Sequence, residues 1–297
     1  MLYGAAYYPE HRDPAKWDRD LDRMAEAHVN ALRVGEFAWK RFEPREGEYD
    51  FAWMEAFAQK AAARGVRLLM CPPMRTAPTW LVEKDRGILI ENSEGVRLEF
   101  GSRYTFCINH PLLREKGLAL AERMAGQWGE SQAVLGWHLD NEYGDEPDCH
   151  CPVCAAKFRE WLEGRYGSIE DLNRRWGTAF WGLEFDAFRQ VPTPRLSKTW
   201  FGPGHMQAWR SFRSECTVEI VGLHAEAVRR HATQPVTTNN QPLWNNRTDY
   251  FAMAGHLEVC GTNYYPPYGE KCRASALGLA NVRGFKCAGF HVHELRN

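Results

Sequence analysis

The sequence contains no long apolar run, no surplus of either charge and no signal for export. No stretch approaches 18 consecutive apolar residues, so the sequence predicts no membrane-spanning helix. Its 37 Lys and Arg residues balance 38 Asp and Glu residues, and the formal charge of −1 gives no electrostatic reason to expect nucleic acid or an acidic membrane as a partner. The first residues lack the basic and apolar regions of a secretory signal, so we expect a cytoplasmic protein.

Internal repeats, low-complexity tracts and flexible linkers are also absent, and we expect residues 1–297 to form one domain. Short apolar runs alternate with longer helical patterns along the whole chain. These runs predict seven strands, over residues 2–8, 31–35, 66–71, 133–139, 235–238, 257–263 and 285–293. Helices are predicted from residue 14 and over residues 51–64, 111–128, 155–166 and 205–231.

The alternation of strands and helices predicts an α/β fold with a parallel sheet covered by helices. A doubly wound open sheet is one alternative, but no Gly-rich phosphate-binding loop follows the first predicted strand. A TIM-type (β/α)₈ barrel fits better, because the notable polar residues fall at the carboxyl ends of predicted strands. The predicted barrel ends after its seventh strand, which would leave the first and seventh strands with open edges.

Two glutamates follow predicted strands. Glu142 lies just beyond the fourth strand, and Glu294 closes the seventh. Two carboxyl groups at one barrel mouth would suit glycoside hydrolysis, in which one group protonates the leaving oxygen and the other attacks the anomeric carbon. From the residues alone, the alternative is a pair of barrel-rim acids that form ion pairs with Arg or Lys.

Four segments extend this pattern: GAAYYPEH at 4–11, RVGEFAW at 33–39, EPREGEYDF at 43–51 and WHLDNEYG at 137–144, the most specific of them. Together they resemble glycoside hydrolase family 42, the β-galactosidases of bacteria and some archaea. The resemblance implies a retaining mechanism on a (β/α)₈ barrel that acts on terminal, non-reducing β-D-galactose residues. It implies that Glu142 is the acid/base, that Glu294 is the nucleophile, and that Arg103 and Asn141 lie beside the bound sugar.

These roles agree with the chemistry of the side chains. Arg103 could keep a neighbouring carboxylate ionised by direct pairing, and Asn141 could bond the sugar 2-hydroxyl. The alternatives are a structural salt bridge for Arg103 and a helix cap or turn for Asn141. Weaker candidates are four aromatic residues near strand ends that could stack on sugar rings: Trp39, Trp80, Tyr264 and Tyr265. Glu36 could lie near the substrate or could equally form an ion pair at the barrel rim. Asn239, which follows the fifth predicted strand, could contact the sugar.

Nine cysteines are present, an odd number that cannot all pair within one chain. Cys149, Cys151 and Cys154 lie within six residues and could face one metal ion, with Cys107 as the best fourth ligand. His150 could replace a cysteine, but we expect it to point elsewhere. The residues alone leave zinc, an iron–sulfur cluster and free thiols open. The family resemblance implies a structural Zn²⁺ site. The other cysteines are expected to be buried small hydrophobes: Cys71, Cys216, Cys260, Cys272 and Cys287.

Members of the family continue past the nucleophile into an eighth strand, a trimerisation domain and a small β domain, none of which we expect within residues 1–297. His293 also stands where the family pattern has an apolar residue. The open edges leave room for a homo-oligomer or a partner chain that completes the barrel. Two alternative functions remain beside β-galactoside hydrolysis: a truncated homologue that only binds sugar, and a cysteine-cluster metalloprotein without glycosidase activity.

Overall fold

A computed structural model describes residues 2–240 and 247–263, and its centre is one parallel sheet of six strands. The strands follow one another across the sheet in chain order: β1 (Gly4–Ala6), β2 (Ala31–Val34), β3 (Arg67–Met70), β4 (Val134–His138), β5 (Val236–Asn240) and β6 (Val259–Thr262). Six parallel strands in this order form an open half-barrel of the (β/α)₈ type, which confirms the predicted fold class. The predicted seventh strand, residues 285–293, lies outside the described residues.

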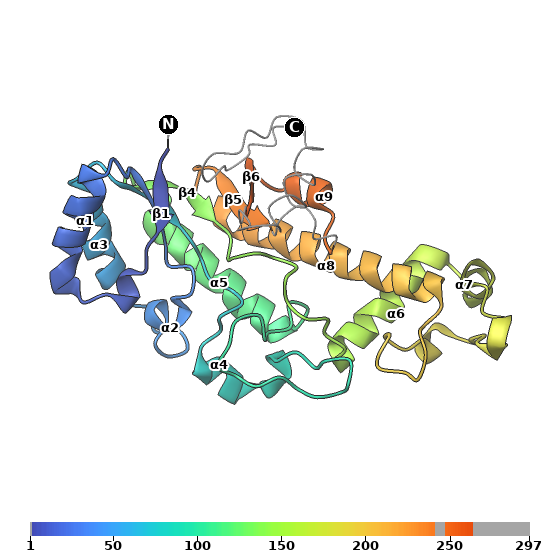
Figure 1. The fold of residues 1–297 in the computed structure, drawn as a ribbon. Helices are drawn as coiled ribbons and strands as arrows, with labels where there is room; N and C mark the ends of the chain where they lie inside the picture. Colours follow the sequence, from blue (N-terminus) through green and yellow to red (C-terminus); the bar gives the residue numbers. More distant parts are fainter. Residues whose placement is uncertain (1, 241–246, 264–297) are drawn as a thin grey trace, which may run out of the picture.

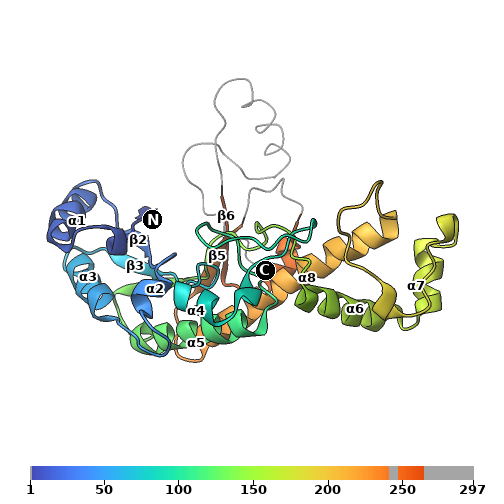
Figure 2. The same cartoon turned by 90° about the horizontal axis from the view of Figure 1, so that it is seen from below.

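Helices connect each strand to the next, as the alternating pattern predicts. Those that follow β1 to β5 are α1 (Trp17–Glu26), α2 (Trp39–Phe42), α3 (Ala52–Ala62), α4 (Thr79–Lys84), α5 (Pro111–Trp128), α6 (Pro152–Tyr166), α7 (Ile169–Trp176), α8 (Pro203–Arg229) and α9 (Tyr250–Ala254). Helix α1 packs beside α3 and α5 beside α8, while α6 and α7 lie beyond the sheet at the right of Figures 1 and 2. No helix in this part of the chain has the length and apolar character needed to cross a bilayer.

Local signals explain where most of these helices begin. The Asp13 side chain accepts a hydrogen bond from the Ala15 amide at 3.0 Å, although Pro14–Lys16 forms a 3-10 turn and the α-helix starts only at Trp17. Helix α6 starts at Pro152, three residues before the predicted position, because proline suits the first helical turn.

Helix α7 was not predicted, although both of its ends carry a signal. The Ser168 side chain accepts a hydrogen bond from the Asp171 amide at 3.2 Å and caps the first turn. Gly177 ends the helix with φ of +66°, a left-handed conformation that favours glycine. The helix is only 8 residues long and mostly polar, so its sequence resembles that of a loop.

The end of helix α5 offers a test of how tightly the outer helices pack. A Cβ atom at Gly129 would collide with the backbone carbonyls of His231 and Ala125, neither of which can rotate away. Gly129→Ala is therefore expected to lower the free energy of unfolding by about 1–3 kcal/mol. Gly126→Ala is the matched control, because no atom lies within 4 Å of its added Cβ and alanine favours a helix by about 0.5–1 kcal/mol. Urea denaturation of both variants measures the difference, and equal stabilities would contradict this packing.

Candidate active site and cysteine cluster

Glu142 lies just beyond the end of β4, at the carboxyl edge of the sheet, and its side chain is only 6% exposed. Its Oε2 accepts a hydrogen bond from the Tyr104 hydroxyl at 2.7 Å and another from Asn141 Nδ2 at 3.3 Å. Its Oε1 accepts one from Asn263 Nδ2. Burial and the hydrogen bond to Glu142 raise the pKa of Tyr104, so its hydroxyl stays a proton donor at neutral pH.

Asn239, at the end of β5, joins the loops that surround this carboxylate. Its Nδ2 donates to Asn141 Oδ1 at 2.7 Å and to Asn263 Oδ1 at 3.1 Å, and its Oδ1 accepts from the Glu142 amide at 3.1 Å. The site is therefore assembled from the segments that follow β3 and β4 and from the ends of β5 and β6. This is the edge where a (β/α)₈ barrel places its functional groups.

The backbone around Glu142 is held in an unusual conformation. Asp140 has φ of +46° and Glu142 has φ of +53°, in the left-handed region that costs a non-glycine residue on the order of 1–3 kcal/mol. The Asp140 carboxylate offsets this strain by accepting hydrogen bonds from three backbone amides, those of Met74 at 2.9 Å, Arg75 at 2.6 Å and Asn141 at 2.6 Å. The β4 turn is thereby tied to the loop after β3.

Arg103 lies close to this cluster but does not touch the Glu142 carboxylate directly. Its exposed guanidinium stacks over the Tyr104 ring at 4.9 Å and over the Phe37 ring at 5.5 Å. It lines an open cavity of about 510 Å³ together with Lys40 and Phe100. Arg103 makes no ion pair with any described acidic residue, so the structure does not support the salt-bridge alternative within these ranges.

Two of the weaker candidates have structural partners. Glu36 is buried and forms an ion pair with Arg33 at 2.9 Å, and it accepts a hydrogen bond from the Tyr8 hydroxyl at 3.1 Å. Burial raises the pKa of Glu36, and Arg33 opposes this effect. Trp39 is fully buried in the core and donates to the Glu43 carboxylate at 2.9 Å, so it does not offer a face to a sugar.

Trp80 is half-buried, and its indole donates to the Glu43 carbonyl at 3.1 Å. Three other predicted site residues, Glu294, Tyr264 and Tyr265, lie outside the described residues. The sequence interpretation did not include Tyr104 and Asn263 as site residues. Two features of the sequence could have pointed to them as site residues: Asn263 ends a predicted strand, and Tyr104 directly follows the candidate Arg103.

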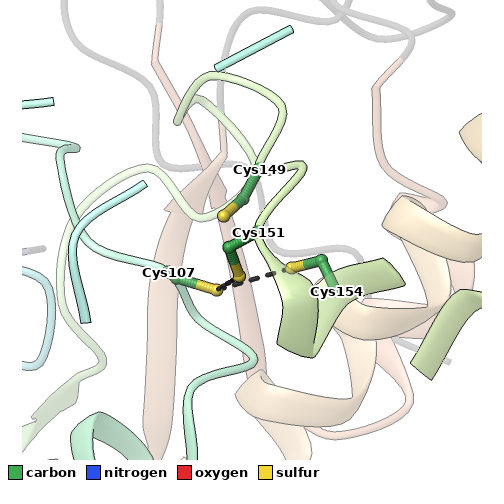
Figure 3. A group of neighbouring side chains, drawn as sticks. All are labelled: Cys107, Cys149, Cys151 and Cys154. Atoms are coloured by element: carbon green, nitrogen blue, oxygen red, sulfur yellow. Dashed lines mark hydrogen bonds between the residues drawn. The ribbon is translucent and has the colours of Figure 1, made fainter. Parts of the chain in front are cut away.

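The four cysteines predicted to gather do so, as Figure 3 shows. The sulfur atoms of Cys107, Cys149, Cys151 and Cys154 all lie within 4.8 Å of one another. Cys107 Sγ is 3.8 Å from Cys151 Sγ and 3.4 Å from Cys154 Sγ. A tetrahedral site with metal–sulfur bonds of about 2.3 Å needs sulfur–sulfur separations of about 3.8 Å, so the cluster fits one metal ion.

Among the described residues, the candidate metal ligands of this cluster are the four cysteine sulfurs and no other side chain. The His150 ring stacks on Trp209, with 4.9 Å between ring centres, and does not belong to the sulfur group. Cys71, Cys216 and Cys260 are buried free thiols, as expected for small core residues. Cys272 and Cys287 lie outside the described residues.

Behind the site, a buried histidine makes the stability of the fold sensitive to acid. The Tyr143 hydroxyl lies 2.9 Å from His224 Nδ1, and burial lowers the pKa of His224 from 6.5 to about 4. Between these values the unfolded chain binds a proton that the folded chain does not, so this contribution is present above pH 6.5 and lost as the pH falls towards 4.

We therefore expect acidification from pH 7 to pH 4 to cost about 3 kcal/mol of unfolding free energy through His224. Urea denaturation at several pH values measures the slope. The slope should flatten in His224→Gln, and an unchanged slope in that variant would contradict the assignment.

Comparison with known proteins identifies the family. The family described as Beta-galactosidase, glycoside hydrolase family 42, matches residues 6–288. A β-galactosidase of Thermus thermophilus is 36% identical over 295 residues, which is 96% of this chain and 46% of the relative. The crystal structure of a β-galactosidase from Bacillus circulans sp. alkalophilus has a TM-score of 0.89 at 28% identity and covers 96% of this chain and 43% of that one.

The structure of a β-galactosidase from the Antarctic haloarchaeon Halorubrum lacusprofundi has a TM-score of 0.86 at 33% identity, covering 90% of this chain and 40% of that one. The 297 residues thus span less than half the length of the relatives they match. The match nevertheless extends through the half-barrel and the segments that surround Glu142. The chain belongs to glycoside hydrolase family 42, the β-galactosidase family.

Proposed function

We propose that this chain supplies the catalytic barrel of a retaining β-galactosidase that hydrolyses terminal β-D-galactosyl residues. The observation that carries the proposal is the buried Glu142 carboxylate at the end of β4, held by donors from Tyr104, Asn141 and Asn263. Membership of the family supports the substrate class, because its relatives are described as β-galactosidases.

In the first step, Glu142 would protonate the oxygen that leaves the anomeric carbon, and in the second it would remove a proton from the attacking water. The named donors hold the carboxylate in one place during both steps. Asn141, whose amide is oriented by Asn239 and Tyr104, would bond the sugar 2-hydroxyl. Arg103 would contact the sugar from the neighbouring loop.

Glu294 is our proposed nucleophile, which would form the covalent glycosyl-enzyme intermediate. A retaining enzyme needs its two carboxyl groups about 5–5.5 Å apart. The proposal therefore requires Glu294 to approach the edge of the sheet where Glu142 lies. We also propose that residues 1–297 act as one barrel unit.

We further propose that the cysteine cluster binds structural Zn²⁺. The four thiols are the ligand set that zinc prefers in closed, tetrahedral structural sites. When bound, zinc would join the loop that carries Cys107 to the start of α6, where the other three ligands lie. Tyr104 and Arg103 lie on the same loop as Cys107, so the cluster would stabilise one side of the active site.

The function is tested by following 4-nitrophenyl β-galactoside hydrolysis by the purified, zinc-loaded protein. We expect turnover that is lost in Glu294→Gln and kept in Glu219→Gln, a control on the outer helix α8. Galactose binding without turnover would favour the sugar-binding alternative. Iron instead of zinc in the protein as it is first purified, together with no turnover, would favour a metalloprotein of another kind.

A further inference from the structure

A buried arginine lies beneath the turn that carries Glu142. Arg75, in the loop after β3, is only 1% exposed. Its guanidinium forms an ion pair with Glu146, approaches Asp140 Oδ1 at 3.5 Å, and donates a hydrogen bond to the backbone carbonyl of Asn141. One side chain therefore contacts Asp140 before Glu142 and Glu146 after it, and also binds the backbone carbonyl of the residue directly before Glu142.

The charges of this group explain why the arginine stays ionised. Burial alone would lower the pKa of Arg75, but Asp140 and Glu146 outweigh it, and the pKa is raised above its ordinary value. Both acids are themselves buried, with 2% and 4% exposure. Removing the cation would leave two carboxylates close together in a region that excludes water, and each would then repel the other.

The arginine also reaches the residue that holds the Glu142 carboxylate. The centre of its guanidinium lies 5.0 Å from the Tyr104 ring and 4.4 Å from the Tyr143 ring. The Tyr104 hydroxyl donates to Glu142 Oε2 at 2.7 Å. Arg75 thus fixes the backbone before Glu142 through Asn141 and packs against the ring of the donor that orients its carboxylate.

We propose that Arg75 is a positioning residue for the acid/base, which holds Glu142 in line with the leaving oxygen by clamping the left-handed turn from Asp140 to Glu142. This inference rests on the proposed function. The hydrogen bonds and ion pairs of Arg75 are made to Asp140, Asn141 and Glu146 and not to the Glu142 carboxylate, so Arg75 acts through the turn. A displacement of about 1 Å at a catalytic group can cost on the order of 100-fold in rate, so the clamp has a large expected effect.

A purely structural role would slow every substrate alike, whereas a positioning role would not. Hydrolysis of phenyl β-galactoside needs protonation of its leaving oxygen, while 2,4-dinitrophenyl β-galactoside needs little. We expect Arg75→Met to lower kcat/KM, which reports the first displacement alone, roughly 100-fold for the phenyl substrate and by less than about tenfold for the dinitrophenyl substrate. Arg64→Met, which breaks ion pairs with Asp18 and Asp22 on the outer helices, should leave both rates unchanged.

Two further variants keep the test decisive if Arg75→Met does not fold. Arg75→Lys keeps the charge but loses the forked donors, so it should recover part of the phenyl rate. The double variant Arg75→Met with Glu146→Gln removes one positive and one negative charge together, which lessens the repulsion and still breaks the clamp. It should fold and show the same difference between the two substrates.

Equal losses for both substrates in Arg75→Met, or in the double variant, would overturn the inference. Glu142→Gln, measured beside them, separates this outcome from a failure of the proposed function. If Glu142→Gln discriminates between leaving groups and the Arg75 variants do not, only the clamp is wrong. If Glu142→Gln does not discriminate, the acid/base assignment itself is wrong and the clamp falls with it.

Discussion

Glu142→Gln is expected to lower kcat/KM for phenyl β-galactoside by about 100- to 10,000-fold, and to lower kcat/KM for the 2,4-dinitrophenyl substrate far less. The amide occupies the space of the carboxyl group and can still accept the Tyr104 hydrogen bond. It cannot give a proton to the leaving oxygen, so poor leaving groups lose the most. Initial rates with a series of substituted phenyl galactosides measure this dependence.

The second half of the reaction gives an independent signature of the same residue. Without a general base, water attacks the glycosyl-enzyme slowly, whereas an anion such as azide needs no deprotonation. Azide should therefore speed turnover of the dinitrophenyl substrate by Glu142→Gln and give β-galactosyl azide. Glu219→Gln should behave like the unmodified protein. Uniform losses across leaving groups, or no response to azide, would show that Glu142 is not the acid/base.

The second largest expected effect is a loss of bound zinc and of thermal stability when one cysteine of the cluster is replaced. Cys151→Ser should reduce bound zinc from about one ion per chain to a trace, because a closed tetrahedral site loses one of its four ligands. Structural zinc contributes about 10–16 kcal/mol of apparent binding free energy in zinc-finger peptides, and even a fraction of this would lower Tm markedly. Elemental analysis and thermal unfolding measure the two quantities.

The geometry also predicts how activity follows the metal. Cys107 lies three residues after Tyr104, so release of the loop should disturb the hydrogen bond to Glu142. Cys216→Ala is the matched control, a buried free thiol outside the sulfur group, and it should keep full zinc content. Zinc content and Tm that do not differ between Cys151→Ser and the unmodified protein would contradict the site.

The sequence predicts the sheet well because most described strands are short runs rich in apolar or β-branched residues and bounded by turn residues. Val134–His138 and Val236–Asn240, for example, lie at or within two residues of their predicted positions. Glu142 and the cysteines at 149, 151 and 154 could be singled out because they lie in compact motifs, whereas Cys107 was predicted to join the cluster from a separate loop. The short helix Ile169–Trp176 was missed, since its polar surface resembles a loop.

Other parts of the site depend on contacts that span long stretches of chain. Arg75 lies in a segment rich in proline and threonine, for which the sequence predicts an exposed turn. Its partners Asp140 and Glu146 lie 65 and 71 residues further along the chain, so the sequence does not show that they meet. Trp39 follows a strand as a sugar-stacking residue would, yet its ring is used by the core. Sequence position alone cannot show which way a side chain points when both faces of a segment are apolar.

The central claim, that this half-barrel carries a retaining β-galactosidase, is tested most directly by ¹H NMR of phenyl β-galactoside hydrolysis in deuterated buffer. The spectrum reports the substrate, the reaction and its stereochemistry together. We predict that β-galactopyranose appears first and that the α anomer grows later by mutarotation, because two successive displacements retain configuration. If α-galactopyranose appears first, or if the folded, zinc-loaded protein releases no galactose, the proposed mechanism is contradicted.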